Sequence, residues 1–199
     1  LGREGEAVVR TPGRLVAVWP QRFQSNADLT YLRDHGRMFS NVAAVAPGWT
    51  MGLTGVGEPA KLTVARVSGN LFETLGAAPL ARRASTEQEA RRGAADVMVL
   101  SHEGWQRYFQ GDPSIIGRIV RLDGTPFEVI GVMPKRFEVF GLRADAYTTF
   151  ALDPAAWYHQ LAFSLFVARI SDGVSMEQAE AEYGALIPVI RQARGYTAD

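Results

Sequence analysis

The chain has 199 residues, 47% of them hydrophobic, and its 21 Lys and Arg residues balance its 21 Asp and Glu residues. This length and composition suit a globular protein with a sizeable core in one domain or two small ones, and the neutral balance indicates neither nucleic acid nor anionic lipid as a partner. The absence of cysteine excludes disulfides, thiolate metal sites and a cysteine nucleophile, and no run reaches the roughly 18 apolar residues of a membrane span.

The N-terminal part of the chain predicts a strand and then a helix. Leu1–Arg10 is too polar for the core of a signal peptide, and Arg14–Trp19 is an apolar, β-prone run. A helix is expected to begin near Asp28, because apolar or small residues then recur at alternating steps of three and four. These residues are Leu29, Leu32, Gly36, Phe39 and Ala43. The pair Pro47-Gly48 is expected to end this helix.

A hairpin and two short helices are expected next. Thr50–Thr54 and Ala60–Val67 predict two strands joined by a glycine-rich turn. Ser68–Gly76 predicts a two-turn helix with Ser68 or Asn70 as its cap and Gly76 as its stop. Thr86–Glu89 has the form of a capping box, so a short charged helix is expected there, ended by Gly93.

The middle of the chain predicts a strand followed by a helix with an aromatic face. Asp96–Leu100 is a β-prone run, and Ser101 is expected to cap the helix that follows. The aromatic residues of this helix are Trp105, Tyr108 and Phe109. Ala146–Ala151 and Phe163–Ile170 predict two further strands.

The last predicted element is a helix that opens at a second capping box, Ser175–Gln178. One apolar stripe follows it, formed by Met176, Ala179, Tyr183, Leu186 and Ile190. Pro188 is expected to kink or end this helix. The order of elements indicates an α+β fold with mixed or antiparallel sheets.

The glycine-rich stretch 111–134 allows two interpretations, a phosphate-binding loop or a hairpin. A P-loop needs Gly, four residues and then Gly-Lys-Ser/Thr, but five residues separate Gly111 from Gly117, and no lysine or hydroxyl follows. The hairpin interpretation accounts for each position. Asp123-Gly124 is a favoured reversal between the β-prone runs Arg118–Leu122 and Phe127–Val132. Pro126 is then expected at an edge or just outside the pairing.

A search for catalytic or metal-binding patterns finds none. The histidines His35, His102 and His159 lack metal-ligand spacing, and Ser101 lacks the Gly-x-Ser-x-Gly elbow of a nucleophile. The acidic residues Glu177, Glu180 and Glu182 are interpreted as the solvated side of the last helix. The tryptophans Trp49, Trp105 and Trp157 are interpreted as core residues in preference to exposed protein-binding aromatics. We therefore expect no catalytic, cofactor-binding or metal-binding residue, and no partner-binding residue can be named.

The order of elements and several strings together resemble the extracytoplasmic core domain of MacB-like ABC transporter permeases, including their duplicated orphan-permease relatives. The matching strings are Leu29-x-x-Leu-Arg-Asp34 with Phe39-Ser40, Val67–Asn70 with Phe72-x-x-Leu-Gly76, Val99–Ser101 with Trp105 and Phe109, Gly111–Pro113 with Gly117, Leu122–Gly124, and Val129–Val132 with Pro134. Two departures are apparent. Leu80–Ala84 stands where the family has a Gly-Arg-x-Phe string, and the family's strand after the last helix is missing, which suggests truncation.

The resemblance implies a domain of two parts. Residues 1–80 and 145–199 would form a porter-like half of βαβ units, and residues 81–144 would form a smaller inserted α+β subdomain. Such a domain stands on the periplasmic side of the bacterial inner membrane, between transmembrane helices. It has no cofactor and is not an enzyme, because a cytoplasmic ABC ATPase hydrolyses the ATP.

For this chain, the resemblance implies a role in efflux or mechanotransmission, either relaying ATP-driven motion or docking a membrane-fusion adaptor. Its expected partners are the rest of the permease, a second copy in a homodimer, the ATPase indirectly, and the adaptor, with no nucleic acid. The alternative is a freestanding extracytoplasmic module that binds a ligand or peptide. A permease would carry apolar runs of about 20 residues outside this chain, whereas a secreted module would carry only a signal peptide.

Overall fold

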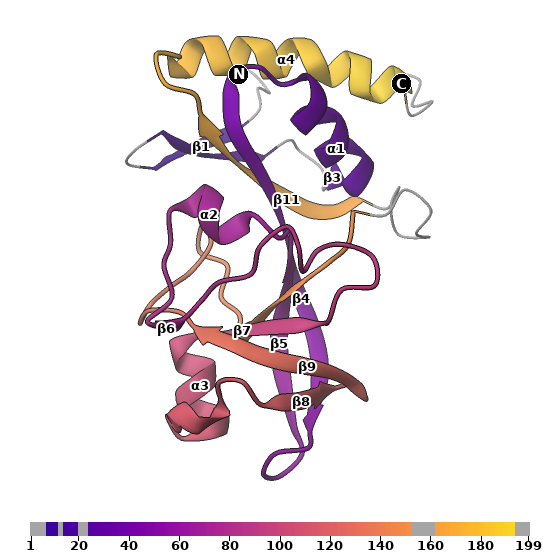
Figure 1. Cartoon of the computed structure of the whole chain (residues 1–199). Coiled ribbons are helices and arrows are strands. Elements are labelled where there is room, and N and C mark those ends of the chain that lie inside the picture. Colours follow the sequence, from indigo (N-terminus) through magenta and orange to yellow (C-terminus); the bar gives the residue numbers. More distant parts are fainter. Residues whose placement is uncertain (1–6, 12–13, 20–23, 153–161, 194–199) are drawn as a thin grey trace, which may run out of the picture. The chain divides into compact units, whose positions relative to one another are not determined.

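The computed structural model of the chain describes residues 7–11, 14–19, 24–152 and 162–193 (Figure 1). The chain forms two compact units. Unit 1 contains Leu1–Ala44 and Pro154–Asp199, and unit 2 contains Val45–Asp153. The chain passes from unit 1 into unit 2 within strand β4 (Phe39–Thr54) and returns between residues 153 and 154.

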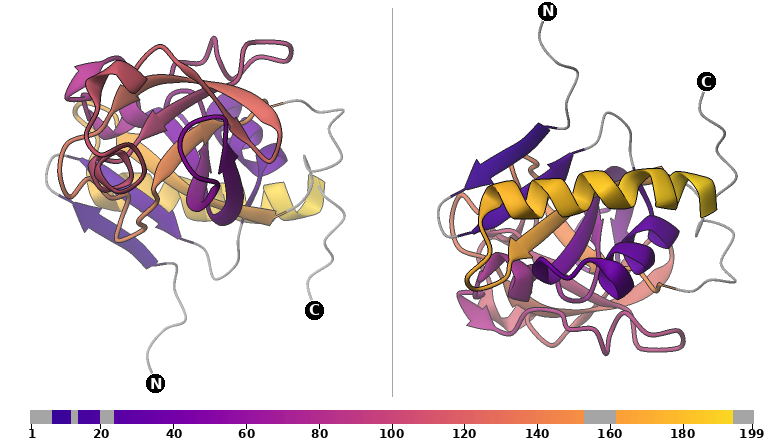
Figure 2. Two further views of the ribbon diagram at one scale, coloured as in Figure 1. Left: turned by 90° about the horizontal axis from the view of Figure 1, so that it is seen from below. Right: turned by 90° about the horizontal axis from the view of Figure 1, so that it is seen from above.

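Unit 1 combines a small sheet with two helices. Its strands are β1 (Ala7–Thr11), β2 (Leu15–Trp19), β11 (Ala162–Ile170) and the first part of β4, in that order, with β3 (Gln24–Ser25) paired to β11. Helices α1 (Asn26–His35) and α4 (Met176–Ala193) lie on the same face of these strands (Figures 1 and 2). Leu29, Leu32, Phe166, Ala179 and Tyr183 are among the residues buried in this unit.

Helix α1 begins at a capping box and ends earlier than the apolar spacing predicts. The Asp28 N–H donates to Ser25 Oγ over 3.2 Å, and the Ser25 N–H donates to Asp28 Oδ2 over 2.8 Å. Gly36 closes the helix with its N–H bonded to the Leu32 carbonyl. Phe39 and Ala43 therefore belong to β4, and the expected helix through these two residues is wrong.

The burial of β4 explains this error. Residues 42–46 are all buried, which is the pattern of a strand covered on both faces. A short, continuous apolar run has no period that distinguishes such a strand from a helix. Pro47 and Gly48 lie inside β4, where the pairing with β5 shifts between Ala46 and Trp49. They mark a strand irregularity instead of the end of a helix.

Unit 2 contains a mixed sheet in the order β4-β5-β10-β7-β9-β6, with β8 paired to both β4 and β9. Its further strands are β5 (Ala60–Val67), β6 (Ala81–Arg82), β7 (Val97–Leu100), β8 (Ile119–Leu122), β9 (Thr125–Val132) and β10 (Ala146–Thr149). Strand β10 is parallel to β5 and antiparallel to β7, and β7 is parallel to β9. The expected α+β class with mixed pairing is confirmed.

Three short helices complete unit 2: α2 (Leu71–Leu75), α3 (His102–Phe109) and the 3-10 turn η1 (Pro113–Ile115). Gly76 ends α2 in the left-handed region at φ 67°, as expected from its position. Leu53, Leu62, Met98, Leu100, Val120, Leu122 and Val129 are among the residues that form the hydrophobic core of this unit.

The stretch 111–134 contains the expected hairpin, formed by β8 and β9. Asp123 and Gly124 have φ of 49° and 84°, the left-handed pair that suits a two-residue reversal between twisted strands. The Asp123 carboxylate also accepts the Gly52 N–H over 2.7 Å. Pro126 lies opposite Arg121, whereas the pairing of β9 with β7 begins only at Glu128. Pro126 therefore lies inside the pairing with β8 and at an edge on the β7 side, in agreement with the edge position that was expected.

Two expectations about helices are corrected. Thr86–Gly93 forms turns and no helix, although the Thr86 N–H does bond to Glu89 over 2.8 Å. The stretch has no apolar stripe to bury, so the box closes a turn instead of starting a helix. In contrast, the box at Ser175 and Gln178 does open α4, which continues past Pro188 to Ala193. Pro188 therefore does not end this helix.

Along the chain, the boundaries between the two compact units fall between residues 44 and 45 and between residues 153 and 154. The subdomain boundaries implied by the resemblance, at 80/81 and 144/145, both fall within unit 2. The division into a porter-like half and an inserted subdomain stays a prediction.

Candidate functional site

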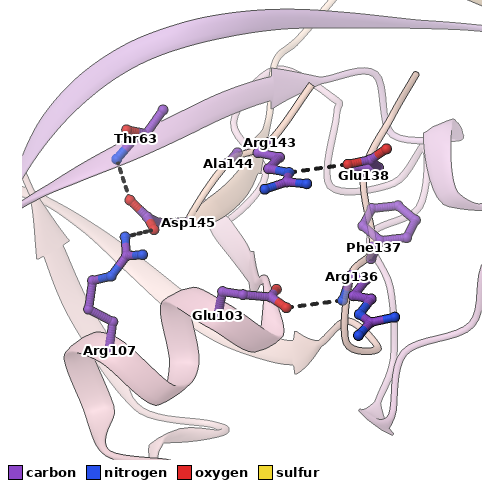
Figure 3. Close-up of a pocket in the computed structure, with 9 residues that line it drawn as sticks. All are labelled: Thr63, Glu103, Arg107, Arg136, Phe137, Glu138, Arg143, Ala144 and Asp145. Atoms are coloured by element: carbon purple, nitrogen blue, oxygen red, sulfur yellow. Dashed lines mark hydrogen bonds and ion pairs between the residues drawn. The ribbon is translucent and has the colours of Figure 1, made fainter. Parts of the chain in front are cut away.

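Unit 2 contains a pocket of about 550 Å³ beside helix α3 (Figure 3). We call it the α3 pocket. It is lined by Thr63, Glu103, Arg107, Arg136, Phe137, Glu138, Arg143, Ala144 and Asp145. The lining therefore brings together three arginines and three carboxylates from α3 and from the loop between β9 and β10, and β5 adds Thr63.

Helix α3 presents Glu103 and Arg107 to the pocket, because residues at i and i+4 share one helix face. The helix begins at Ser101, as expected, and the Ser101 Oγ accepts the Gly104 N–H over 2.9 Å. The same hydroxyl donates to the Asp145 carbonyl over 3.1 Å. Ser101 is thus a buried cap that joins α3 to the loop before β10.

Asp145 is the most enclosed charge of the pocket. Its Oδ1 lies 2.9 Å from Arg107 Nη1, and its Oδ2 accepts the Thr63 N–H over 2.9 Å. The Tyr108 hydroxyl lies 3.4 Å from Oδ2 and donates over 2.9 Å to the Lys61 carbonyl oxygen. Both carboxylate oxygens are therefore bonded, which a nearly buried carboxylate requires. Asp145 fixes α3 against strand β5.

The loop from Arg136 to Arg143 forms the other side of the pocket. Arg136 and Phe140 both have positive φ, at 60° and 51°, and Val139 bridges Leu142. Arg143 Nε lies 3.2 Å from Glu138 Oε2, and the Arg136 N–H donates to Glu103 over 3.0 Å. This N–H is the main reason why the pKa of Glu103 lies below its usual range. The loop is thereby tied to α3.

An aromatic cluster lies behind the pocket. Phe137 packs against Tyr147 and Phe72, with ring centroids 5.5 and 5.8 Å apart, and Tyr147 meets Phe72 edge-on. The Tyr147 hydroxyl is buried and has no hydrogen-bond partner among the described residues. Burial raises the pKa of Tyr147 far above its usual range, and the nearby Glu103, Glu138 and Asp145 raise it further.

The residues singled out from the sequence do not converge on this pocket. His35 stacks on Tyr31 and His102 meets the edge of Trp105, while His159 lies outside the described residues. Within the described part of the chain, no group of three or more His, Asp or Glu residues could hold a metal ion.

Glu182 departs from the interpretation of a wholly solvated acidic face. Its carboxylate accepts the N–H groups of Arg37 and Met38 over 3.0 and 2.7 Å, and so joins α4 to the turn before β4. Glu177 and Glu180 are exposed, as expected.

The tryptophans also divide. Trp49 is 40% exposed, with the Arg66 guanidinium 5.7 Å from its ring centroid, so its assignment to the core is wrong. Trp105 is partly buried against the core of unit 2, and Trp157 lies outside the described residues.

Comparisons with known proteins agree on one family. The sequence model of the MacB-like periplasmic core domain family matches residues 5–186. The extracellular domain of the noncanonic ABC-type transporter YknZ from Gram-positive bacteria has a TM-score of 0.66 and 19% identity, over 89% of this chain and 87% of that chain. The periplasmic region of MacB from Actinobacillus actinomycetemcomitans has a TM-score of 0.66 and 15% identity, over 87% of this chain and 76% of that chain. No curated protein sequence matches the chain.

The fold and the family match define the extracytoplasmic domain of a membrane permease of the ABC-transporter class. More particularly, the chain belongs to the MacB-like periplasmic core domain family, because the match spans most of its length. No helix in the described ranges is long and apolar enough to cross a membrane. Family membership implies a transmembrane remainder of the permease and an ATPase partner.

Proposed function

We propose that this domain carries out no catalysis and instead relays ATP-driven motion across the extracytoplasmic side of its permease. The observation that carries the proposal is the division into two compact units, between which the chain passes within β4 and again between residues 153 and 154. Two cores joined by two chain crossings can shift against each other while each stays folded, as in hinge and shear motions.

The pocket chemistry supports a role without catalysis. Each of the three carboxylates of the α3 pocket has a partner in the protein. Asp145 and Glu138 form ion pairs with arginines, and Glu103 accepts a backbone N–H. A general base needs a pKa suited to its task and an oxygen within hydrogen-bond reach of the substrate proton. These carboxylates instead bond to neighbouring groups of the protein and hold α3, β5 and the loop together.

A relay needs a receiver of the motion. We therefore include in the proposal a second copy of the permease, paired in a homodimer, and an adaptor docked on this domain. Docking without relay is the second form of the same function. Membership in the permease family argues against a freestanding ligand- or peptide-binding module.

The test uses the intact permease with its other cysteines replaced, since this domain has no native cysteine. One cysteine is placed in unit 1 at the exposed Glu180 and one in unit 2 at the exposed Glu73. A panel of reducible bismaleimide linkers of different lengths then finds the span that joins them. Glu177→Cys with Glu180→Cys, both on α4, is the matched control.

Linking the two units is expected to stop export while ATP hydrolysis continues at least in part, and reduction of the linker should restore export. The control link within α4 should leave export unchanged. Export that persists after complete linking of the two units would rule out the relay and favour docking.

A further inference from the structure

In the two ion pairs of the α3 pocket, the guanidinium is more exposed than the carboxylate. In the pair with Asp145, the Arg107 side chain is 63% exposed and the Asp145 side chain only 11%. In the pair with Glu138, the corresponding fractions are 86% for Arg143 and 41% for Glu138. The guanidinium is thus the outer group in both pairs. At these two pairs, a molecule that arrives from solvent meets positive charge first.

The arginines also hold unused hydrogen-bond capacity. A guanidinium has five N–H donors. The bond from Arg107 to Asp145 uses Nη1, and the bond from Arg143 to Glu138 uses Nε. The Arg136 guanidinium forms no hydrogen bond or ion pair within the described residues.

The pocket also offers apolar surface. The Phe137 ring lines it and is backed by Tyr147, whose buried hydroxyl has no partner among the residues that the structure describes. A volume of about 550 Å³ lies within the range of small-molecule sites. A bound molecule can therefore place an apolar group against Phe137 while a charged group meets the arginines (Figure 3).

We propose that the α3 pocket binds a small molecule that carries an oxyanion, either a phosphate or a carboxylate, next to an apolar part. Charge-assisted bonds from guanidinium groups to such oxyanions are among the strong hydrogen bonds of proteins. At Asp145 and Glu138, a cationic ligand would have to displace a guanidinium from its carboxylate. The inference goes beyond the relay, which assigns no ligand, and holds whether or not the two units move.

The test is an NMR titration of the ¹⁵N-labelled chain with phenyl phosphate, benzoate, inorganic phosphate and benzylamine. Phenyl phosphate or benzoate is expected to give saturable shifts at the amides of Thr63 and Phe137. Inorganic phosphate lacks the apolar part, so its Kd should be at least about tenfold higher than that of phenyl phosphate. The cationic benzylamine should not bind. Comparing phenyl phosphate with benzoate shows which oxyanion the pocket prefers.

Variants identify the groups responsible. Arg136→Ala with Arg143→Ala is expected to raise the Kd about tenfold or more, because two charge-assisted bonds are lost. Arg136→Ala alone removes no side-chain bond given by the structure, so it keeps the test valid if the double variant does not fold. Arg107 is not substituted, because its loss would leave the nearly buried Asp145 carboxylate without its ion-pair partner and destabilise the fold. The matched control is Arg118→Ala, an exposed arginine outside the pocket.

Several results would overturn the proposal. These are the absence of saturable shifts with both aromatic anions, shifts centred away from the pocket, benzylamine binding as tightly as the anions, or inorganic phosphate binding as tightly as phenyl phosphate. An unchanged Kd in the folded arginine variants would overturn it as well.

Discussion

At the scale of single residues, Gly124 tests the reversal between β8 and β9. Its φ is 84°, and no atom lies within 4 Å of the position that a Cβ would occupy, so a substitution there acts through the backbone alone. Gly124→Val is expected to lower the free energy of unfolding by about 1 to 3 kcal/mol, because a β-branched residue is strained at this φ. Urea denaturation measures the change. The neighbouring Thr125→Val, within strand β9, is the control, and equal stability of the two variants would contradict the account.

Residue-level contacts divide into those that sequence can predict and those that it cannot. The caps at Ser101 and Ser175 are local, because the donor and the acceptor lie three residues apart, and both are confirmed. The pairing of Arg107 with Asp145 joins positions 38 apart, and Glu182 reaches back 144 positions to Met38. A single sequence contains no local pattern that specifies such contacts. The α3 pocket cannot be predicted for this reason, although the i, i+4 spacing of Glu103 and Arg107 is a local feature of the sequence.

At the scale of elements, the stability of helix α3 depends more on the close contact between Gly104 and Asp145 than on helix propensity. A Cβ at Gly104 would lie 2.2 Å from the carbonyl oxygen of Asp145. Alanine has a higher helix propensity than glycine by about 1 kcal/mol, so propensity predicts that Gly104→Ala stabilises the protein. Overpacking predicts the opposite, a loss of about 1 to 3 kcal/mol. Thermal unfolding decides between them, with the exposed Gln106→Ala as the control. A higher Tm for Gly104→Ala would contradict the observed packing.

Elements were predictable where the pattern has a clear period or a strong turn signal. The hairpins at β4-β5 and β8-β9, helix α4 and strand β11 are all confirmed. The prediction failed at β4, where five consecutive buried residues carry no period, and at Thr86, where a capping box stands without an apolar stripe. Strand β1 is not among the predicted elements, because Ala7–Thr11 is short and overlaps the polar stretch Leu1–Arg10.

At the scale of the whole molecule, family membership rests on a combination of strings that are each weak. The turns and caps at Gly76, Ser101 and Asp123-Gly124 have the positions that the fold requires, so these parts of the resemblance have a physical basis. The same strings say nothing about motion. The relay therefore depends on the existence of two compact units and needs a measurement of its own.

The most direct measurement is the distance between spin labels in the intact permease, one at Glu180 in unit 1 and one at Gln106 in unit 2, both exposed. A pair within unit 2, at Glu73 and Gln106, is the control. The account predicts that the distance between units changes when ATP and vanadate trap the ATPase, while the distance within unit 2 stays constant. The same distance between units in the nucleotide-free and trapped states would contradict the relay.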